Sequence, residues 1–119
     1  MEAKEFLLQY MDALRRIELN RKRIESTEHI AAEVCRRNFY AYASEFQDKI
    51  YEENEELIKL KISIELAIER CPCSETEREV LYRRFILGEK WEQVAGDMLY
   101  SVQHLHRLEN SALKKVKVP

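Results

Sequence analysis

Two residues near the C-terminal end of the chain, Gln103 and Arg107, carry side chains that can recognise DNA bases. In a major groove, a glutamine amide can pair bidentately with adenine and an arginine guanidinium with guanine. His106 lies beside them and could bond a base or a phosphate, whereas Val102 could contact only a thymine methyl group. All four residues face away from the expected core of their segment, so they predict a surface that contacts DNA.

Such a surface needs a helix that a neighbouring helix holds in place. Residues 91–113 predict two short helices joined by a tight turn, and Ser101 is the expected N-cap of the second helix. The expected buried residues are Val94, Ala95 and Met98 in the first helix and Leu105, Leu108 and Ala112 in the second. This order of features is typical of a helix-turn-helix, whose second helix can enter a major groove, although any helical hairpin could share it.

The segment before this pair predicts one more helix. Ser74 and Glu77 have the spacing of a capping box at its start, and Gly88 stands where a left-handed C-terminal cap belongs. Arg83 and Arg84 come late in this helix. Their guanidinium groups could contact DNA phosphates or merely complement the negative end of the helix dipole, and the sequence favours neither role.

Positive charge gathers at the C-terminal end of a slightly acidic chain. Residues 1–70 contain 12 Lys and Arg against 15 Asp and Glu, and residues 71–119 contain 8 against 7, so net charges of −3 and +1 give the total of −2. Lys114 and Lys115 belong to the basic tail. This is the expected footprint of phosphate contacts, but it is faint, so tight DNA binding would need a dimer or a larger assembly.

The composition predicts an all-α fold. The 119 residues allow one domain or two very small ones, and 45% apolar and 35% charged residues with two Gly and two Pro favour long helices. No apolar run is long enough to cross a membrane, and the first residues lack the layout of a signal peptide. Three cysteines without framework spacing suit a reducing compartment, so we expect a cytoplasmic protein without a membrane contact.

The N-terminal part of the chain predicts a coiled-coil-like hairpin of long antiparallel helices. We expect helices over roughly residues 3–25 and 45–70, with a further helical stripe around Cys35 between them. The chain could reverse near Ala43–Ser44, where Ser44 would be an N-cap, or alternatively at Ser26.

This hairpin would be a domain separate from the DNA-binding segment. Asn54 occupies a core position of a heptad-like run, a device that fixes helix register at some cost in stability. Residues 1–71 are then expected to serve oligomerisation or partner contact, and residues 72–119 to form the helix-turn-helix domain.

Metal binding and catalysis have little support in the sequence. Cys71 and Cys73 form a C-x-C pair, but structural zinc needs four ligands with paired spacing. The other candidate ligands are Cys35, His29, His104 and His106, of which the last two point to different faces of one helix. The chain has no Gly-rich phosphate loop and no catalytic triad pattern, so we expect no metal, no cofactor and no enzymatic activity.

The C-terminal part resembles region 4 of bacterial sigma-70-type factors. Residues 77–88 resemble the first helix of that region, and residues 90–95 and 100–115 resemble its helix-turn-helix and basic tail. The opening residues 2–10 and 13–17 are similar to small region-4-like phage and prophage proteins, among them the ArpU-type and RinA-type late transcription regulators. The resemblance implies transcription control, with DNA contacts at Val102, Gln103, His106 and Arg107 and with Arg83 and Arg84 near the DNA backbone.

Two departures from the family pattern change these expectations. Sigma factors usually carry Arg or Glu at the positions of Val102 and Gln103, so their base preference does not transfer. The turn position usually filled by Gly is Leu99, for which a left-handed backbone costs roughly 1 kcal/mol or more. No segment resembles the core-binding or −10-reading regions of a full sigma factor, so we do not expect promoter opening.

Three functions remain open at this point. The first is a sequence-specific transcriptional regulator of phage or prophage type that binds double-stranded DNA as a homodimer through its N-terminal helices or together with RNA polymerase. The second is a protein–protein adaptor with a degenerate helix-turn-helix. The third is the DNA-recognition subunit of a phage packaging terminase.

Overall fold

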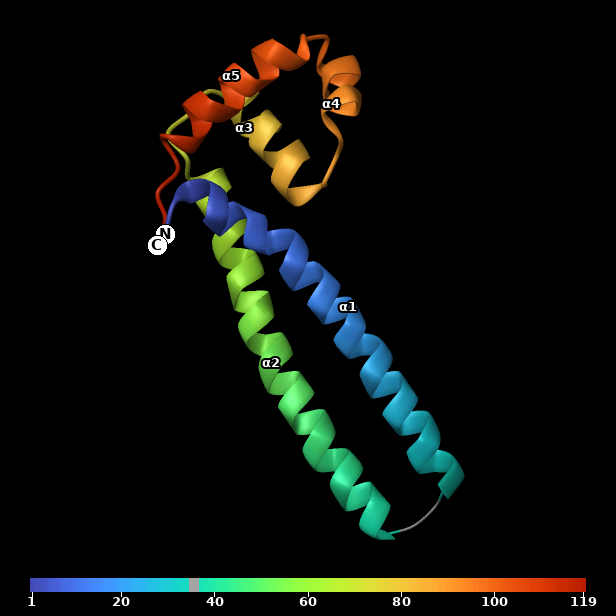
Figure 1. The fold of residues 1–119 in the computed structure, drawn as a ribbon. Helices are drawn as coiled ribbons and strands as arrows, with labels where there is room; N and C mark the ends of the chain where they lie inside the picture. The colour runs from blue at the N-terminus through green and yellow to red at the C-terminus, as the bar shows by residue number, and fades with distance from the viewer. Residues whose placement is uncertain (35–36) are drawn as a thin grey trace. The chain divides into compact units, whose positions relative to one another are not determined.

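The chain is all-helical in the part that the computed structural model describes, namely the backbone of residues 1–34 and 37–119 and the side chains of residues 1–30 and 43–119. No strand occurs among these residues, so the all-α prediction is confirmed. The elements, shown in Figure 1, are α1 (Ala3–Val34), α2 (Arg37–Glu69), α3 (Glu75–Leu81), the π-helical turn η1 (Tyr82–Ile86), α4 (Trp91–Met98) and α5 (Val102–Leu113).

The chain forms two compact units. Unit 1 consists of Met1–Asp12 and Lys61–Pro119, and unit 2 consists of Ala13–Leu60. Helices α1 and α2 each contribute to both units, because α1 begins in unit 1 and α2 ends there. None of the described helices combines the length and the apolar character needed to cross a bilayer.

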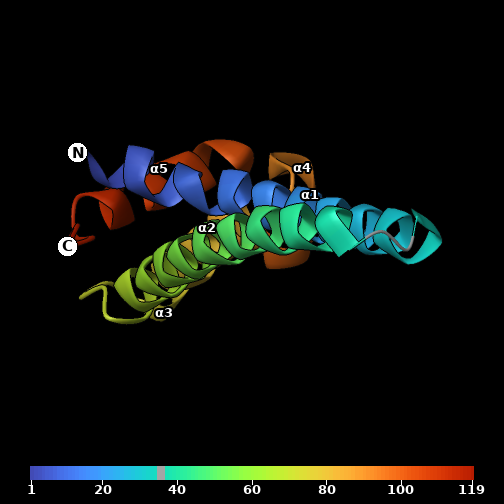
Figure 2. The same cartoon turned by 90° about the horizontal axis from the view of Figure 1, so that it is seen from below.

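Within unit 2, α1 and α2 run antiparallel and side by side (Figure 2). The Arg16 guanidinium donates to the Glu53 carboxylate of the opposite helix. A buried polar centre follows: Asn20, which is 0% exposed, donates from Nδ2 to Oδ1 of Asn54 at 2.8 Å. The Asn20 amide also donates to Glu53 at 3.2 Å, and Arg23 donates to the Asn20 carbonyl oxygen at 3.0 Å. Asn54 therefore has a matching amide partner on α1.

The predicted end of the first long helix and the predicted start of the second are wrong, whereas the outer ends expected near residues 3 and 70 agree with Ala3 and Glu69. Helix α1 continues past residue 25 to Val34, and α2 begins at Arg37, so Ser26 and Ser44 both lie inside helices. No Gly or Pro interrupts either segment, and the Thr27 hydroxyl donates to the carbonyl of Arg23 at 2.8 Å, which satisfies that side chain within the helix. Cys35 lies outside the described residues.

Unit 1 places the first turns of α1 and the last turns of α2 with the three shorter helices. Its buried residues include Leu7 and Ile64, both 0% exposed. The Tyr10 hydroxyl donates to the Glu65 carboxylate at 3.2 Å. Gly88 has φ +67°, and a Cβ at this position would lie 3.1 Å from the Cε of Met11. Gly88 therefore meets both a backbone and a space requirement, as the predicted left-handed cap needs.

Candidate nucleic-acid interface

Helix α3 begins at the predicted capping box. The Glu77 backbone N–H donates to the Ser74 hydroxyl oxygen at 3.1 Å, and that hydroxyl donates to the Glu77 carboxylate at 3.1 Å. The helix then widens into η1, where the Leu87 N–H donates to the Tyr82 carbonyl at 3.0 Å, before it ends near Gly88. The sequence predicted the start and the end of this segment but not the π-helical turn.

A small apolar cluster holds α3, α4 and α5 together. Val80, Val94 and Leu105 are each 0% exposed and come one from each helix. Four partly buried side chains pack around them: Trp91, Ala95, Met98 and Leu108. Because this cluster uses the predicted apolar stripe of α5, the opposite side of that helix is not needed for packing.

The turn between α4 and α5 depends on Leu99. This residue has φ 59° and ψ 38°, a left-handed conformation, and its side chain is 87% exposed. Its N–H donates to the Ala95 carbonyl and thereby closes α4. A left-handed backbone costs a non-Gly residue about 1–2 kcal/mol, so the strain expected from the sequence is present in the turn.

Helix α5 starts at the predicted N-cap. Ser101 has an extended backbone with φ −69° and ψ 152°, and its hydroxyl oxygen accepts from the His104 N–H at 3.1 Å. The cap and the left-handed turn together set the direction in which α5 leaves α4.

The face of α5 that packing leaves free carries the four residues singled out in the sequence. Val102, Gln103, His106 and Arg107 are all exposed. The His106 ring lies 4.4 Å from the Trp91 ring, which restrains it against the start of α4. No hydrogen bond or ion pair from Gln103 or Arg107 is formed within the described part of the chain. These two side chains are therefore free to contact a partner.

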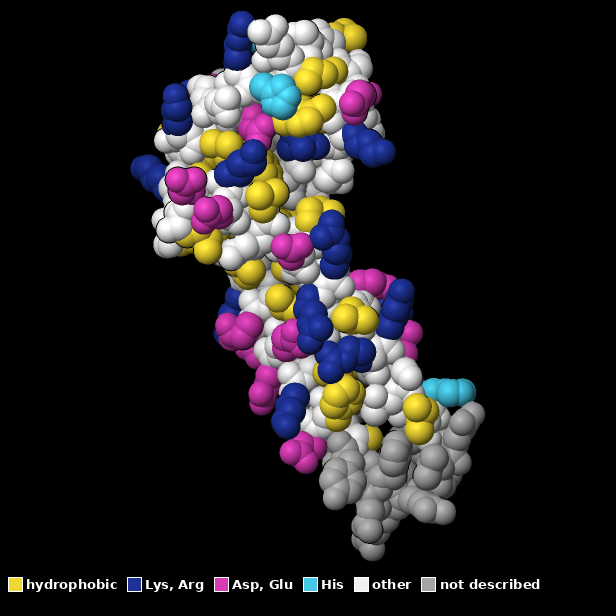
Figure 3. All heavy atoms as spheres, viewed as in Figure 1, with side chains coloured by type: hydrophobic (Ala, Val, Ile, Leu, Met, Phe, Trp, Pro, Cys, Tyr) yellow, Lys and Arg dark blue, Asp and Glu magenta, His cyan; other side chains and the backbone are white. Residues whose placement is uncertain are grey.

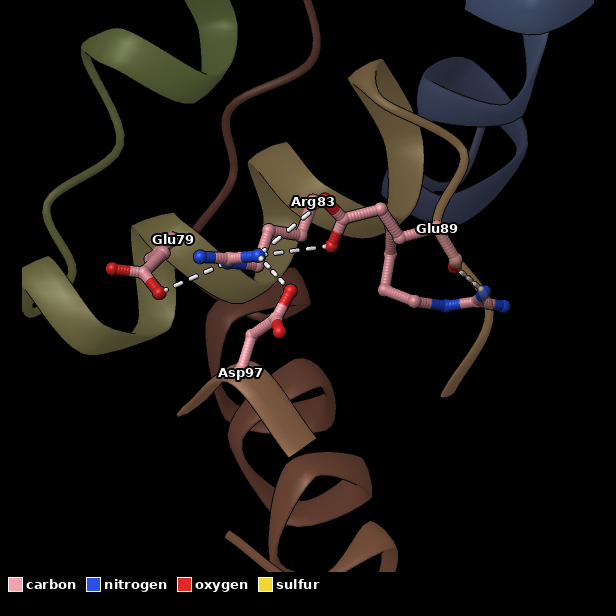
Figure 4. A network of polar contacts seen from close by, with 5 residues as sticks. Glu79, Arg83, Glu89 and Asp97 are labelled. Atoms are coloured by element: carbon pink, nitrogen blue, oxygen red, sulfur yellow. Dashed lines mark hydrogen bonds and ion pairs between the residues drawn. The ribbon is translucent and has the colours of Figure 1, made fainter. Parts of the chain in front are cut away.

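The Arg83 side chain, in contrast, is surrounded by carboxylates (Figure 4). It donates to Glu79 at 3.0 Å, to Glu89 at 3.0 Å and to Asp97 at 3.2 Å. The hydrogen bonds that Arg83 donates to Glu89 and then to Glu79 raise the pKa of Arg83. Arg83 thus links η1, the segment after it and α4, and its donors point at acids of the same chain.

Arg84 also contacts its own chain. Its Nη1 donates to the Glu89 carbonyl, and its guanidinium carbon lies 4.2 Å from the centre of the Trp91 ring. Its buried Nε has no hydrogen-bond partner among the residues that the structure describes. Trp91 therefore contacts both Arg84 and His106. This arrangement braces the start of α4 through a cation–π contact.

The lysines of the basic tail also differ in whether they are paired within the chain. Lys115 donates from Nζ to both carboxylate oxygens of Glu77, at 3.0 and 3.1 Å, and this contact lowers the pKa of Glu77 more than any other. Lys114 and Lys117 are exposed and form no ion pair among the described residues. On the face drawn in Figure 3, basic and acidic side chains are interspersed, with no extended basic patch. The free positive charge near α5 is therefore limited to a few residues.

Comparisons with protein-family models, with curated proteins and with solved structures find no match to this chain. The geometry of α3, α4 and α5 is therefore the basis for a function.

The cysteine pair shows a packing role. Cys71 is buried and its thiol lies 3.9 Å from the carbonyl oxygen of Ala112 on α5. Burial, with Cys73 close by, raises the pKa of the Cys71 thiol to about 12, so it is a poor thiolate ligand. Among the residues that the structure describes, no three His, Cys, Asp or Glu side chains lie close enough to share a metal ion.

Two features of this region were missed in the sequence. The three acids around Arg83 lie at positions 79, 89 and 97, and only the first has helical spacing from it. The contact of Trp91 with Arg84 and His106 joins three elements. Neither pattern is periodic, so neither could have been found without the fold.

Proposed function

We propose that α4 and α5 form a helix-turn-helix that reads double-stranded DNA, and that the protein is a sequence-specific transcriptional regulator. The observation that carries this proposal is the free face of α5. Gln103 and Arg107 are exposed and unpaired on a helix whose other side is held by an apolar cluster. A helix presented in this way suits a major groove.

The residues of α5 have different roles in this proposal. Gln103 pairs with an adenine and Arg107 with a guanine, while Val102 contacts a thymine methyl group. Ser101, Lys114 and the unbonded N–H groups at the start of α5 are suited to phosphate contacts. His106 is held against Trp91, so its contact with DNA has a restricted direction.

Arg83 and Arg84 act through α4 in this proposal. Both side chains are engaged within the chain, so they set the position of α4 relative to α3 and η1 instead of neutralising phosphates. Lys115, paired with Glu77, likewise ties the tail to the start of α3. Because these side chains are paired within the chain, few Lys and Arg residues near α5 remain unpaired.

A single copy has few unpaired basic side chains for phosphate contacts, which supports binding as a dimer or together with RNA polymerase. Counting Arg107, Lys114 and Lys117 as phosphate or base contacts, a single copy should show a salt slope of roughly −3. Helices α1 and α2 supply a long surface for a second copy, on which Leu19 of unit 2 is 46% exposed.

The test is selection of binding sites by the full-length protein from a random pool of duplexes, followed by fluorescence anisotropy on the enriched site. We expect an enriched motif containing adenine and guanine at adjacent positions. Gln103→Ala with Arg107→Ala should weaken binding at least about tenfold and relax the motif. The matched control, Gln47→Ala with Lys49→Ala on α2, should bind as the wild type does. Failure to enrich any motif would refute the proposal.

An adaptor function is the second candidate, and one observation favours it. Leu99, Tyr100 and Val102 place three exposed hydrophobic side chains at the turn, with Leu99 87% exposed. Such a cluster suits a protein partner better than DNA. Capture of RNA polymerase without retardation of any duplex would favour the adaptor, whereas retention of the selected duplex by Leu99→Ser would favour the DNA reader.

A further inference from the structure

A groove lies in unit 1 between the last turns of α2 and one side of α3 and η1. Its volume is about 670 Å³, and no residue of α4 or α5 lines it. This volume falls within the usual range for pockets that receive small ligands or a few side chains. The proposed DNA contacts use none of its residues, so the groove is available for a separate role.

Part of the groove lining is apolar. Ile62, Leu66 and Tyr82 line it and are 50%, 39% and 45% exposed. Ile62 and Leu66 are four residues apart on α2, so they present one continuous helical face. Single exposed hydrophobic residues are common, but three that converge on one groove indicate a binding surface.

The rest of the groove lining is mostly acidic. Four glutamates line it (Glu65, Glu69, Glu75 and Glu79), against the single basic residue Arg78. The Arg78 guanidinium donates to the carbonyls of Ile68 at 3.3 Å and Cys71 at 2.8 Å, so it braces the end of α2. The lining therefore carries four carboxylates against one guanidinium, a formal net charge of −3. Glu65, Glu75 and Glu79 form ion pairs within the chain, with Lys61, Arg78 and Arg83 respectively, whereas Glu69 is exposed and forms none among the described residues.

We propose that this groove docks a short amphipathic helix of a partner protein, with an apolar stripe that covers Ile62, Leu66 and Tyr82 and with flanking Lys or Arg residues that face the glutamates. Helices with apolar residues at three- and four-residue spacing bind hydrophobic grooves in this way. Charge complementarity favours the basic helix, because an acidic one would meet Glu69 and the net negative charge of the lining.

The same charge argument disfavours a second copy of this chain as the occupant. Residues 62–69, which form the α2 side of the groove, contain Glu65 and Glu69 and no Lys or Arg. A two-fold interface would bring this segment against itself and place like charges opposite one another. The partner is therefore a different protein with a basic helical segment.

The probe is a synthetic peptide of about four helical turns, with Leu at three- and four-residue spacing and Lys elsewhere. Its binding to the full-length protein is measured by fluorescence anisotropy, and its contacts are mapped by NMR. A matched peptide with Glu in place of Lys should bind at least about tenfold more weakly. Ile62→Ala with Leu66→Ala should also weaken the Lys peptide at least about tenfold, with NMR shifts centred on Tyr82 in the wild type.

Charge variants separate the groove from general attraction to an acidic protein. Glu69→Gln with Glu75→Gln should weaken binding about threefold or more, whereas Glu55→Gln with Glu56→Gln, which removes the same charge from α2 in unit 2, should leave it unchanged. Equal effects of both pairs, or no peptide binding, would overturn the proposal.

Two further outcomes distinguish this proposal from others. Concentration-dependent self-association that Ile62→Ala with Leu66→Ala abolishes would assign the groove to a second copy and overturn it. Binding of the selected DNA duplex should be retained in the groove variants, because they leave α5 intact. Loss of peptide binding with DNA binding retained therefore tests the groove independently of the proposed function.

Discussion

The centre of α3, α4 and α5 is apolar, whereas the centre of the α1–α2 pair in unit 2 contains a buried asparagine. In the first, Val80, Val94 and Leu105 meet without a polar atom between their side chains. In the second, Asn20 exchanges hydrogen bonds with Asn54 and neighbouring charged residues. An apolar centre stabilises the short helices and leaves their polar side chains for a partner, while the polar centre uses its hydrogen bonds to set helix register.

Two arginines of unit 1 differ in a similar way, because one is paired within the chain and the other is not. Arg83 is paired with Glu79, Glu89 and Asp97, but Arg107 has no partner among the described residues. Net charge alone would count the two guanidinium groups as equal. Their contacts show that only Arg107 is available to another molecule, and this difference decides which residues we propose as DNA contacts.

Truncation of the apolar centre should have the largest effect. Leu105→Ala removes a fully buried side chain and should lower the free energy of unfolding by about 2–5 kcal/mol in urea denaturation. Val102→Ala, on the exposed face of the same helix, is the matched control and should change it little. Equal effects of the two variants would contradict the assigned orientation of α5.

Removal of the polar centre should have a smaller effect. Asn20→Ala leaves the half-buried amide of Asn54 without its partner on α1, and Glu53 and Arg23 each lose one hydrogen bond. The variant should destabilise the protein by about 1–3 kcal/mol in the same denaturation assay. Asn110→Ala, an exposed asparagine on α5, provides the control. If Asn20→Ala were as neutral as the control, the polar centre would have no part in the stability of the pair.

The ion pair between Lys115 and Glu77 should contribute up to about 1 kcal/mol to the free energy of unfolding, and only at pH values above the acid range. Lys115, Ser111 and Ser74 lower the pKa of Glu77 in the folded protein, so its contribution is present above the ordinary value of 4.5 and is lost as the pH falls below it. Glu77→Gln should therefore be less stable than wild type at pH 7 and converge with it near pH 3. Lys115→Met should behave in the same way, and a stability gap that widens in acid would contradict this assignment.

Relief of the turn should give the smallest effect, and it should be stabilising. Leu99→Gly removes left-handed strain of about 1–2 kcal/mol but adds about 0.5–1 kcal/mol of unfolded-state entropy, so the net gain should be about 0–1.5 kcal/mol. The melting temperature of Leu99→Gly should rise, while Leu99→Ala keeps the strain and should not show this rise. A lower melting temperature for Leu99→Gly would show that the exposed Leu99 side chain stabilises the turn.

The ends of the short helices could be predicted because the signals are local. Ser74, Gly88 and Ser101 each form the cap that their residue type and spacing predicted. The end of α1 and the start of α2 could not be predicted in the same way. Ser26 and Ser44 are residue types that often cap helices, so each resembles a boundary in the sequence. No Gly or Pro stands beside them to end a helix, and both lie inside helices.

The candidate site was predictable to the extent that it follows from a helical face. The buried stripe of α5 leaves Gln103 and Arg107 exposed, as the apolar spacing predicted. The roles of Arg83 and Arg84 depend on residues that the fold brings together from other elements, and the groove beside α3 depends on the crossing of α2. These features require coordinates because their spacing in the sequence is irregular.

The most direct test of the central claim is NMR observation of arginine side-chain N–H signals while the selected duplex is added to the full-length protein. We predict that the Arg107 signal shifts and that the Arg83 signal does not, because Arg107 is free and Arg83 is held by three carboxylates. A shift of the Arg83 signal with an unchanged Arg107 signal would contradict the proposal that the free face of α5 reads DNA.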